Sequence, residues 1–358
     1  MKILIINTVP FMRNGISTVI MNYYDVLRKN NIIEFVINNE IEDDYKMHIE
    51  STGGKIYCWG SRNRKPISYS KKLRQLLKMN DYDIVYIHGN SSTLSVELFS
   101  ARKLKVKKVV HAHNVVTEHP YIDRVLKKYF LKHYDLGFAA SEDAGKFLFN
   151  QNDFFVIPNG IDMKHFYFDV LKRKEIREKL KITDDTKLLL QVGTFTKQKN
   201  HDFSVKLMSN IHDNKIKMIF LGEGELLNEL RSKIKEKGLT NNIIFQTPSN
   251  DINGYFSAAD AVILPSLWEG LPLVGLEAQA SAVPLAISDT LDRRLNICDT
   301  VVTLPLKIEP WKKWIIEEIT LNSERDVKKN QRDIEYAGYD INKNAHDMEL
   351  YFKKISGL

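Results

Sequence analysis

Two glutamates, Glu269 and Glu277, stand eight residues apart across an expected helix start. Pro272 suits the first turn of a helix, where its missing N–H costs no hydrogen bond, so Gly270 and Leu271 form the mouth of this helix. Unpaired amides and the helix dipole at such a mouth attract an anion, and glycine lets a ligand approach the backbone. We expect phosphate there, with the two carboxylates accepting hydrogen bonds from neutral hydroxyls, such as those of a sugar and a ribose.

A second group of candidate residues follows an expected strand near the middle of the chain. Gly193 ends this strand, and Lys197 and Lys199 precede the next helix. Ligands of open α/β sheets bind at the carboxyl ends of strands, so we predict that Lys199 holds a diphosphate as a point charge. Two further strand ends offer Gly222 and Thr247.

These segments resemble, in order, the motifs of family 4 glycosyltransferases, which are retaining enzymes. The resemblance rests on a glycine loop at 13–18, a histidine segment at 110–114, a Pro-Asn-Gly-Ile-Asp string at 158–162, a phosphate loop at 192–195 with 199–200, and the Glu-x7-Glu signature at 269–277. The ordered set spans nearly the whole chain and is therefore far more specific than any one motif.

The resemblance implies an α/β fold of two facing Rossmann-like domains with parallel sheets, the GT-B architecture, and a deep cleft between the domains. We expect an acceptor-binding domain over 1–165 and a donor-binding domain over 166–340. A C-terminal helix within 341–358 is expected to pack back on the first domain.

The resemblance also assigns roles to single residues. His113 is expected to contact the transferred sugar, with His111 as the competing candidate. His113, Glu269 and Lys199 are the expected catalytic residues, and His88 and Asn114 the expected acceptor-binding residues. The expected donor-binding residues are Gly15, Gly193, Thr194, Lys197, Lys199, Gly222, Thr247, Glu269, Gly270, Leu271, Pro272, Leu273 and Glu277.

Two positions depart from the family pattern. Thr194 stands where relatives carry arginine, which removes one cationic contact to phosphate, and Lys197 is a candidate replacement. Asn14 stands where the family often has the first of two glycines. Asparagine tolerates positive φ better than most residues, so we expect the loop to keep its shape.

Alternating strands and helices predict two parallel sheets. The expected strands are 2–6, 32–37, 55–57, 84–87, 108–111, 136–139, 154–157, 187–192, 217–221, 243–246, 261–264, 284–286 and 301–304. Helices are expected between them, for example over 16–28 and 94–104, and over the tail 341–355. The 358 residues, 43% of them hydrophobic, suffice for two cores.

The net charge of +7 is confined to the first half of the chain, because residues 1–165 hold 24 Lys and Arg against 17 Asp and Glu. The basic residues cluster near 62–74, 102–108 and 127–132, with aromatic residues among them. We expect this half to rest on an anionic membrane surface, although a solvated lysine-rich surface explains the same pattern. Two cysteines, no signal-peptide core and no apolar run of membrane-spanning length favour a cytoplasmic, peripherally associated protein.

The sequence therefore predicts a metal-independent hexosyltransferase without a cofactor. It would move a hexose or N-acetylhexosamine from a nucleotide diphosphate sugar, with UDP preferred, to a lipid-linked saccharide in surface polysaccharide assembly. Asp81-Tyr82-Asp83 imitates a metal motif but precedes a strand, away from the expected cleft. A noncatalytic partner subunit, a sugar-nucleotide epimerase and a nicotinamide oxidoreductase are the alternatives, the last weakened by an incomplete glycine fingerprint at 222–224. No motif supports nucleic-acid binding.

Overall fold

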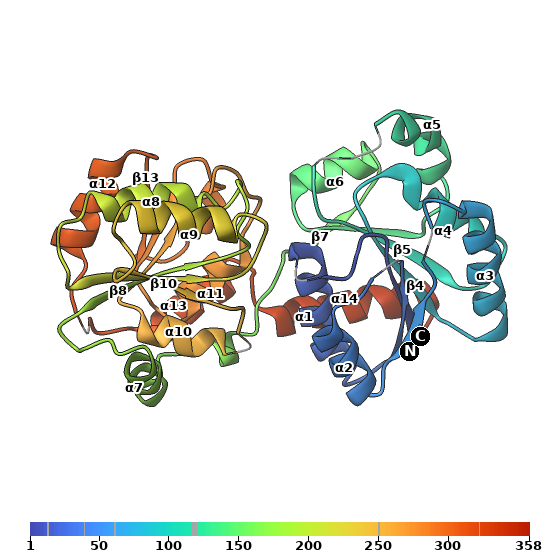
Figure 1. Cartoon of the computed structure of the whole chain (residues 1–358). Helices are drawn as coiled ribbons and strands as arrows, with labels where there is room; N and C mark the ends of the chain where they lie inside the picture. Colours follow the sequence, from blue (N-terminus) through green and yellow to red (C-terminus); the bar gives the residue numbers. More distant parts are fainter. Residues whose placement is uncertain are drawn as a thin grey trace. The chain divides into compact units, whose positions relative to one another are not determined.

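The computed structural model describes residues 1–358 apart from 13, 39, 61, 116, 118, 119, 250 and 322. The chain forms two compact units, each built around its own sheet (Figure 1). The first unit contains Met1–Gly160 and Ile341–Leu358, and the second contains Ile161–Asp340. Residues 161–165, which the sequence-based boundary placed in the first domain, lie in the second unit.

Seven parallel strands form the sheet of the first unit, in the order β3-β2-β1-β4-β5-β6-β7. They are β1 (Lys2–Asn7), β2 (Ile32–Ile37), β3 (Lys55–Cys58), β4 (Ile84–His88), β5 (Lys107–Ala112), β6 (Leu136–Ala139) and β7 (Phe155–Val156). Its helices are α1 (Gly15–Leu27), α2 (Asp43–Ser51), α3 (Pro66–Met79), η1 (Ser92–Leu94), α4 (Ser95–Ser100), α5 (Pro120–Phe130), α6 (Glu142–Phe149) and α14 (Ile341–Ser356). The direction of strand addition reverses between β1 and β4.

Six parallel strands form the second sheet, in the order β10-β9-β8-β11-β12-β13, with the reversal between β8 and β11. They are β8 (Lys187–Val192), β9 (Ile216–Leu221), β10 (Ile243–Gln246), β11 (Ala261–Leu264), β12 (Leu285–Ser288) and β13 (Val301–Leu304). The helices are η2 (Met163–His165), α7 (Val170–Lys179), α8 (His201–Ser209), α9 (Leu227–Glu236), α10 (Ile252–Ala258), α11 (Leu273–Ala280), η3 (Arg293–Leu295), α12 (Ile308–Lys313), η4 (Trp314–Glu318) and α13 (Val327–Tyr336).

Each expected strand is present in the structure, with ends shifted by at most a few residues. The reason is visible in β1, where Ile3, Leu4, Ile5 and Ile6 are all buried. A parallel sheet covered on both faces needs apolar side chains on both faces, so its strands are continuous apolar runs that are easy to recognise. The α/β fold class with two parallel sheets is therefore confirmed.

The C-terminal helix α14 belongs to the first unit and lies beside α1 (Figure 1). Phe352 on α14 is fully buried, with its ring 5.4 Å from that of Tyr86 and 5.8 Å from that of Phe138. Burial of a phenylalanine contributes about 1.5–3 kcal/mol, so this contact helps to hold the tail on the sheet.

The helix expected over 94–104 ends early, because α4 stops at Ser100. Lys103 adopts a left-handed backbone conformation with φ 58°, which a continuing helix does not allow. Arg74 on α3 donates hydrogen bonds to the carbonyls of Ser100 and Arg102 at 2.9 and 2.8 Å. These bonds satisfy carbonyls that the helix would otherwise have used.

Candidate functional site

The loops after β8 and β11 meet at the point where the strand order of the second sheet reverses. Gln198 donates a side-chain hydrogen bond to the carbonyl of Trp268 (2.8 Å), and its own carbonyl accepts one from the amide of Leu267 (2.8 Å). Asn200 donates to the carbonyl of Pro265 (2.9 Å). Two loops that are about seventy residues apart in the chain are therefore tied together at the carboxyl edge of the sheet.

Lys199 and Glu269 form an ion pair between these two loops. Lys199 Nζ lies 2.5 Å from Glu269 Oε2, and both side chains are largely buried. The second oxygen, Glu269 Oε1, is buried without a hydrogen-bond partner among the described residues. A buried acceptor with no donor is costly, so Oε1 is suited to receive a hydrogen bond from a ligand.

Three glycines shape the loop that carries Lys199. Gly193 has φ 149°, and a Cβ there would lie 3.1 Å from the Lys199 side chain. A Cβ on Gly222 would lie 2.1 Å from the carbonyl oxygen of Gly193, and one on Gly224 would lie 2.6 Å from the amide of Phe195. Gly222, predicted as a donor-binding residue, therefore supports the phosphate loop through backbone packing, and Gly224 shares that task.

The helix α11 begins at Leu273, with Pro272 as its N-cap at φ −70° and ψ 122°. Pro272 thus stands one position before the first turn in which it was expected. The amides of Leu273 and Val274 have no acceptor within the helix because of their position. Gly270 is exposed, and a Cβ there would meet no described atom within 4 Å. The mouth of α11 is therefore open to a ligand, next to the Glu269 carboxylate.

Glu277 lies in the second turn of α11 and is only partly exposed. Burial disfavours its charged form and raises its pKa to about 7. The carboxyl group is consequently about half ionised at neutral pH. Hydrogen-bond donors from a ligand would stabilise the ionised form.

The remaining residues of the second unit that were predicted to bind the donor lie at or near the surface. Thr194, Lys197 and Thr247 are exposed, and Leu271 is partly buried. The Thr194 carbonyl accepts a hydrogen bond from the amide of Thr196 (2.8 Å), so its backbone is fixed while its side chain is accessible. These positions remain predictions as ligand contacts.

In the first unit, Gly15 opens α1, directly after the loop that follows β1. A Cβ on Gly15 would meet no described atom within 4 Å. Asn14 has φ −132° and is the N-cap of α1, where its side-chain oxygen accepts a hydrogen bond from the amide of Ser17 (3.0 Å). Asn14 therefore does not use a tolerance of positive φ, as the sequence suggested, because a capping residue has an extended backbone. Arg13, in the same motif, lies outside the described residues.

Three histidines meet at the carboxyl ends of β4 and β5. His88 and His111 are register partners on the two strands, and His113 follows β5. His88 Nδ1 lies 2.8 Å from His113 Nε2, and the rings of His111 and His113 stack with centroids 4.3 Å apart. Tyr86 Oη lies 2.5 Å from His111 Nδ1. The backbone at His113 is held as well, because its amide donates a hydrogen bond to Asn90 Oδ1 (3.0 Å) in the loop after β4.

Burial keeps these histidines neutral. It lowers the pKa of His88 and His111 well below the ordinary value and lowers that of His113 to about 3. A neutral imidazole has one donor and one acceptor nitrogen, so the His88–His113 bond couples the two tautomers. If His88 donates from Nδ1, then His113 must carry its own proton on Nδ1.

This arrangement separates the roles of the three rings. His88 and His111 are buried, whereas His113 is partly exposed. His88, expected to line the acceptor site, is 1% exposed and its Nδ1 is bonded to His113, so it helps to orient that ring. Its contact with an acceptor stays a prediction. Asn114 is exposed, and its side-chain oxygen accepts a hydrogen bond from the amide of Val115 (2.8 Å).

Ring nitrogens of His88, His111 and His113 lie within 4.8 Å of one another, a separation that raises the question of a metal ion. The three rings are within 22–31° of parallel. Imidazole lone pairs lie in the ring plane, so stacked rings must rotate before their nitrogens converge on one ion. The geometry fits a hydrogen-bonded stack better than a preformed metal site.

Asp83, in the segment that imitates a metal motif, has a structural partner. Its carboxylate accepts a hydrogen bond from the amide of Lys2 at 2.7 Å. The bond ties the start of β1 to the residue that precedes β4, which is the expected role of a polar residue at a strand start.

The basic clusters of the first unit are partly used inside the protein. Arg62 is buried and bonds to both carboxylate oxygens of Glu97 at 2.6 and 2.8 Å. Lys108 pairs with Asp135 (3.1 Å). Lys71, Lys72, Lys103 and Lys105 are exposed. None of the helices in the described ranges is long and apolar enough to cross a bilayer.

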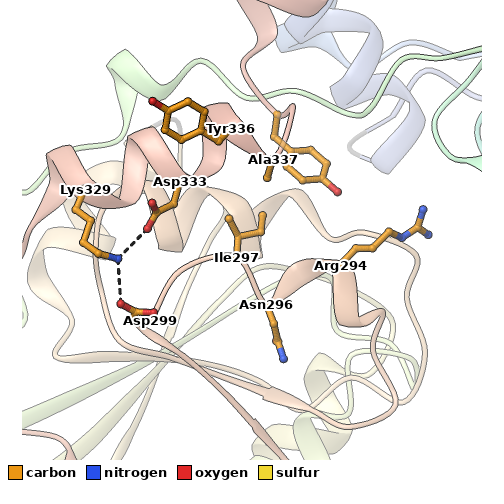
Figure 2. Close-up of a pocket in the computed structure, with 9 residues that line it drawn as sticks. Arg294, Asn296, Ile297, Asp299, Lys329, Asp333, Tyr336 and Ala337 are labelled. Carbon is orange, nitrogen blue, oxygen red and sulfur yellow. Dashed lines mark hydrogen bonds and ion pairs between the residues drawn. The ribbon is translucent and has the colours of Figure 1, made fainter.

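A shallow pocket elsewhere in the second unit is built from η3, α13 and the loop before β13 (Figure 2). Lys329 there bonds to Asp299 and Asp333 at 3.0 and 2.9 Å. The residues that line it differ from those predicted to bind ligand, and its two cations, Lys329 and Arg294, are already paired with carboxylates. We therefore place the candidate site at the β8 and β11 loop ends.

Comparison with known families gives two matches. The model of glycosyltransferase family 4 matches residues 13–165, and the model of group 1 glycosyl transferases matches residues 172–304. The putative glycosyltransferase EpsF of Bacillus subtilis is 28% identical over 318 residues, which are 84% of this chain and 83% of the relative.

Two further proteins are similar. The Escherichia coli UDP-Gal:alpha-D-GlcNAc-diphosphoundecaprenol alpha-1,3-galactosyltransferase is 29% identical over 238 residues, which are 61% of this chain and 60% of the relative. The crystal structure of Anabaena Alr3699/HepE in complex with UDP-glucose has a TM-score of 0.78 at 17% identity, and the match covers 100% of both chains. This structural likeness shows the fold.

The packing of the phosphate loop predicts that two glycine substitutions differ in their effect on stability. Gly222→Ala should lower the free energy of unfolding by about 1–3 kcal/mol, because the new methyl group meets the carbonyl oxygen of Gly193. Gly270→Ala should leave stability unchanged, since nothing described stands near its Cβ. Urea denaturation of both variants measures the difference, and equal stability would contradict the packing role of Gly222.

The histidine stack predicts that His88 acts through a hydrogen bond. His88→Leu should cost about 1–3 kcal/mol of unfolding free energy because it leaves His113 Nε2 without its partner. His88→Asn should cost less, since its amide nitrogen can take the place of Nδ1. Denaturation at pH 7 gives the stabilities, and ¹⁵N NMR gives the tautomer of His113. If both variants lose the same stability and leave the tautomer unchanged, ring volume rather than the hydrogen bond matters.

Proposed function

Because this chain belongs to glycosyltransferase family 4 and has the GT-B fold, we propose that it transfers a hexose or N-acetylhexosamine from a UDP-sugar to a lipid-linked saccharide. The product would enter surface polysaccharide biosynthesis. Support for UDP comes from the HepE complexes with UDP and UDP-glucose, and support for the acceptor comes from the name of the Escherichia coli galactosyltransferase.

The observation that carries this proposal is the Lys199–Glu269 pair at the reversal of the second sheet. In the absence of ligand, each charge neutralises the other. A donor diphosphate would take over Lys199, and the Glu269 carboxylate would then accept hydrogen bonds from the sugar hydroxyls through both oxygens. Glu269 Oε1, which lacks a partner among the described residues, is the acceptor already available.

We propose that the reaction retains the anomeric configuration through attack from the face of the leaving group. The acceptor hydroxyl forms the new bond to the anomeric carbon as the bond to the diphosphate breaks, and the leaving phosphate takes the hydroxyl proton. Lys199 and the amides at the start of α11 stabilise the charge that develops on the phosphate. These positive groups supply the neutralisation that a metal ion gives in other transferases, so the proposed reaction is metal-independent.

The first unit is proposed to bind the acceptor. His113, held neutral by burial, would donate a hydrogen bond to a hydroxyl of the transferred sugar. Gly15 would let the donor approach the backbone at the start of α1, and Asn114 would contact the acceptor. A lipid-linked acceptor requires work at the membrane, so the protein is proposed to be cytoplasmic and peripherally bound to the inner face of the cell membrane.

A noncatalytic partner subunit with the same fold is the alternative. It is favoured by Thr194, which stands where the family motif carries a cationic phosphate ligand. Turnover of a UDP-sugar by the isolated chain would exclude this alternative.

The proposal is tested with a panel of nucleotide sugars in a thermal-shift assay, in which a ligand at 100 times its dissociation constant adds about 2.7 kcal/mol of stability. We expect one UDP-sugar to stabilise the protein more than UDP does. Failure of every nucleotide sugar and of UDP would contradict the proposal.

Glu269→Gln is the matched variant for the same assay. It should abolish the extra stabilisation by the sugar while UDP still binds, because Lys199 stays free for the diphosphate. If Glu269→Gln instead abolished UDP binding itself, the division of roles between Glu269 and Lys199 would be wrong.

The raised pKa of Glu277 predicts pH-dependent nucleotide binding. Ribose hydroxyls donate hydrogen bonds to the carboxylate, so UDP should bind more tightly when Glu277 is ionised. Where Glu277 is protonated before binding, its carboxyl group should release a proton as UDP binds. With a pKa of about 7, affinity should rise roughly tenfold from pH 6 to pH 8. Calorimetry of UDP binding measures this rise.

Glu277→Gln is the control, because it keeps the shape of the side chain but does not titrate. The protonation of UDP itself affects the wild type and the variant equally. The variant should bind UDP more weakly and show only the smaller pH dependence of the nucleotide. The same variant should be more stable than the wild type without ligand at pH 8. A raised pKa in the folded protein means that this group's stability contribution is complete below pH 4.5 and lost as pH rises through about 7. Identical pH profiles would refute a ribose contact.

A further inference from the structure

The helix α5 presents apolar side chains to solvent. Tyr121, Ile122 and Val125 are 85%, 51% and 79% exposed, although α5 packs on η1 and α4. A helix on the surface of a globular protein normally turns such residues inward. The exposed apolar face of α5 therefore needs a partner or another physical reason.

Two charged residues of α5 point into the protein instead. The Asp123 carboxylate accepts a hydrogen bond from the amide of Ser92 in η1 at 2.5 Å. Lys127 donates to the carbonyl of Phe147 in α6 at 2.9 Å. These bonds fix the rotation of the helix about its axis, so the apolar face is held outward by the fold itself.

The exposed face of α5 carries positive charge only. Arg124 and Lys128 are exposed and flank the apolar residues, whereas the single acid of the helix, Asp123, is turned inward. An apolar strip flanked by cations matches the surface of a bilayer that contains anionic lipid, where the rings and aliphatic groups enter the interface and the cations meet headgroups. A protein partner would be expected to meet acids and neutral polar groups as well.

The same surface continues onto α4. Phe99 is 42% exposed, and the Arg102 guanidinium lies 3.8 Å over its ring. The ring centroid of Phe99 lies 6.3 Å from that of Tyr129 on α5. Aromatic and cationic side chains are thus paired along two neighbouring helices, which extends the apolar and basic surface beyond α5.

The position of α5 also connects it with the candidate site. It begins at Pro120, on the connection that leaves β5 after His113, and its first turn bonds to η1, which follows β4 after His88. Figure 1 shows α5 at the top of the first unit in this view. The helix is therefore anchored at the same edge of the sheet as the histidine stack.

We propose that α5, through Tyr121, Ile122 and Val125 with Arg124 and Lys128, is the element that docks this protein on an anionic lipid surface. The inference rests on the proposed function only in placing a lipid-linked acceptor beside His113. Docking would bring the edge that carries His88 and His113 toward the membrane, where such an acceptor is held.

The test is sedimentation of the full chain with vesicles. Wild type should sediment with phosphatidylcholine vesicles that contain 30% phosphatidylglycerol (roughly the anionic content that gives a strong surface potential) and not with phosphatidylcholine alone. The double variant Ile122→Ser, Val125→Ser should bind at least about tenfold more weakly, because it removes two aliphatic groups that would be buried. Arg124→Gln with Lys128→Gln should weaken binding on the order of fivefold per cation and reduce its salt dependence.

A matched control lies in the second unit. Val170 and Leu171 are 64% and 79% exposed at the start of α7, so Val170→Ser with Leu171→Ser removes a similar aliphatic surface and no charge. This control should sediment as wild type does. The fluorescence of Tyr121→Trp should shift to the blue on adding anionic vesicles, which reports entry of that side chain into the interface.

Several outcomes would overturn the proposal. One is failure of wild type to bind anionic vesicles at low salt, and another is unchanged binding of the Ile122 and Val125 double variant. A wild-type dimer that this double variant abolishes would assign the face to self-association instead. UDP binding, measured on each variant, shows that the fold is intact. For the wild type, absence of vesicle binding with UDP binding retained refutes docking alone, whereas vesicle binding without any nucleotide binding refutes the proposed function alone.

Discussion

Each sheet reverses its strand order once, and this constraint determines where the Lys199–Glu269 pair, Gly15 and His88 lie. Parallel strands bring all their carboxyl ends to one edge, and at a reversal the two following connections leave in opposite directions, so the edge between them stays open. In the second sheet the reversal separates β8 from β11, whose loops supply Lys199 and Glu269. In the first sheet the reversal separates β1 from β4. The loop after β1 leads to Gly15, and the loop after β4 begins directly after His88.

The electrostatics of the second unit follow from that open edge. Lys199 and Glu269 come from different loops, and either charge alone would be costly in such a buried place, so they pair when no ligand is bound. Among the residues that the structure describes, no cation forms an ion pair with Glu277, and its burial raises the pKa to about 7. The site can therefore adjust its charge to an anionic ligand in two ways, by exchanging the partner of Lys199 and by changing the protonation of Glu277.

The sequence was sufficient for the strands and insufficient for most long-range contacts. Continuous apolar runs such as Ile3 to Ile6 revealed the strands, and the glycines and lysines at strand ends led to the prediction of a phosphate loop. Local pattern contained no sign that Gly222 packs on Gly193 or that His88 bonds to His113, since these partners are separated by 29 and 25 residues. For the same reason, the count of basic residues overestimated the basic surface. Arg62, for example, is buried and bonded to Glu97 rather than exposed to solvent. Pairings of this kind depend on the register of the sheets and on the packing of helices, which a motif does not encode.

The orientation of α5 illustrates how two such contacts can reverse a local rule. Its apolar residues alone would predict a buried face, and its charged residues an exposed one. The hydrogen bonds of Asp123 to η1 and of Lys127 to α6 reverse this assignment and leave Tyr121, Ile122 and Val125 outward. Exposing these groups to water forgoes stabilisation that burial would give, and the fold maintains that exposure with specific bonds. Local preference and tertiary structure disagree most often where a protein acts on something else, so the exposed face of α5 is better explained by a binding role than by an accident of packing.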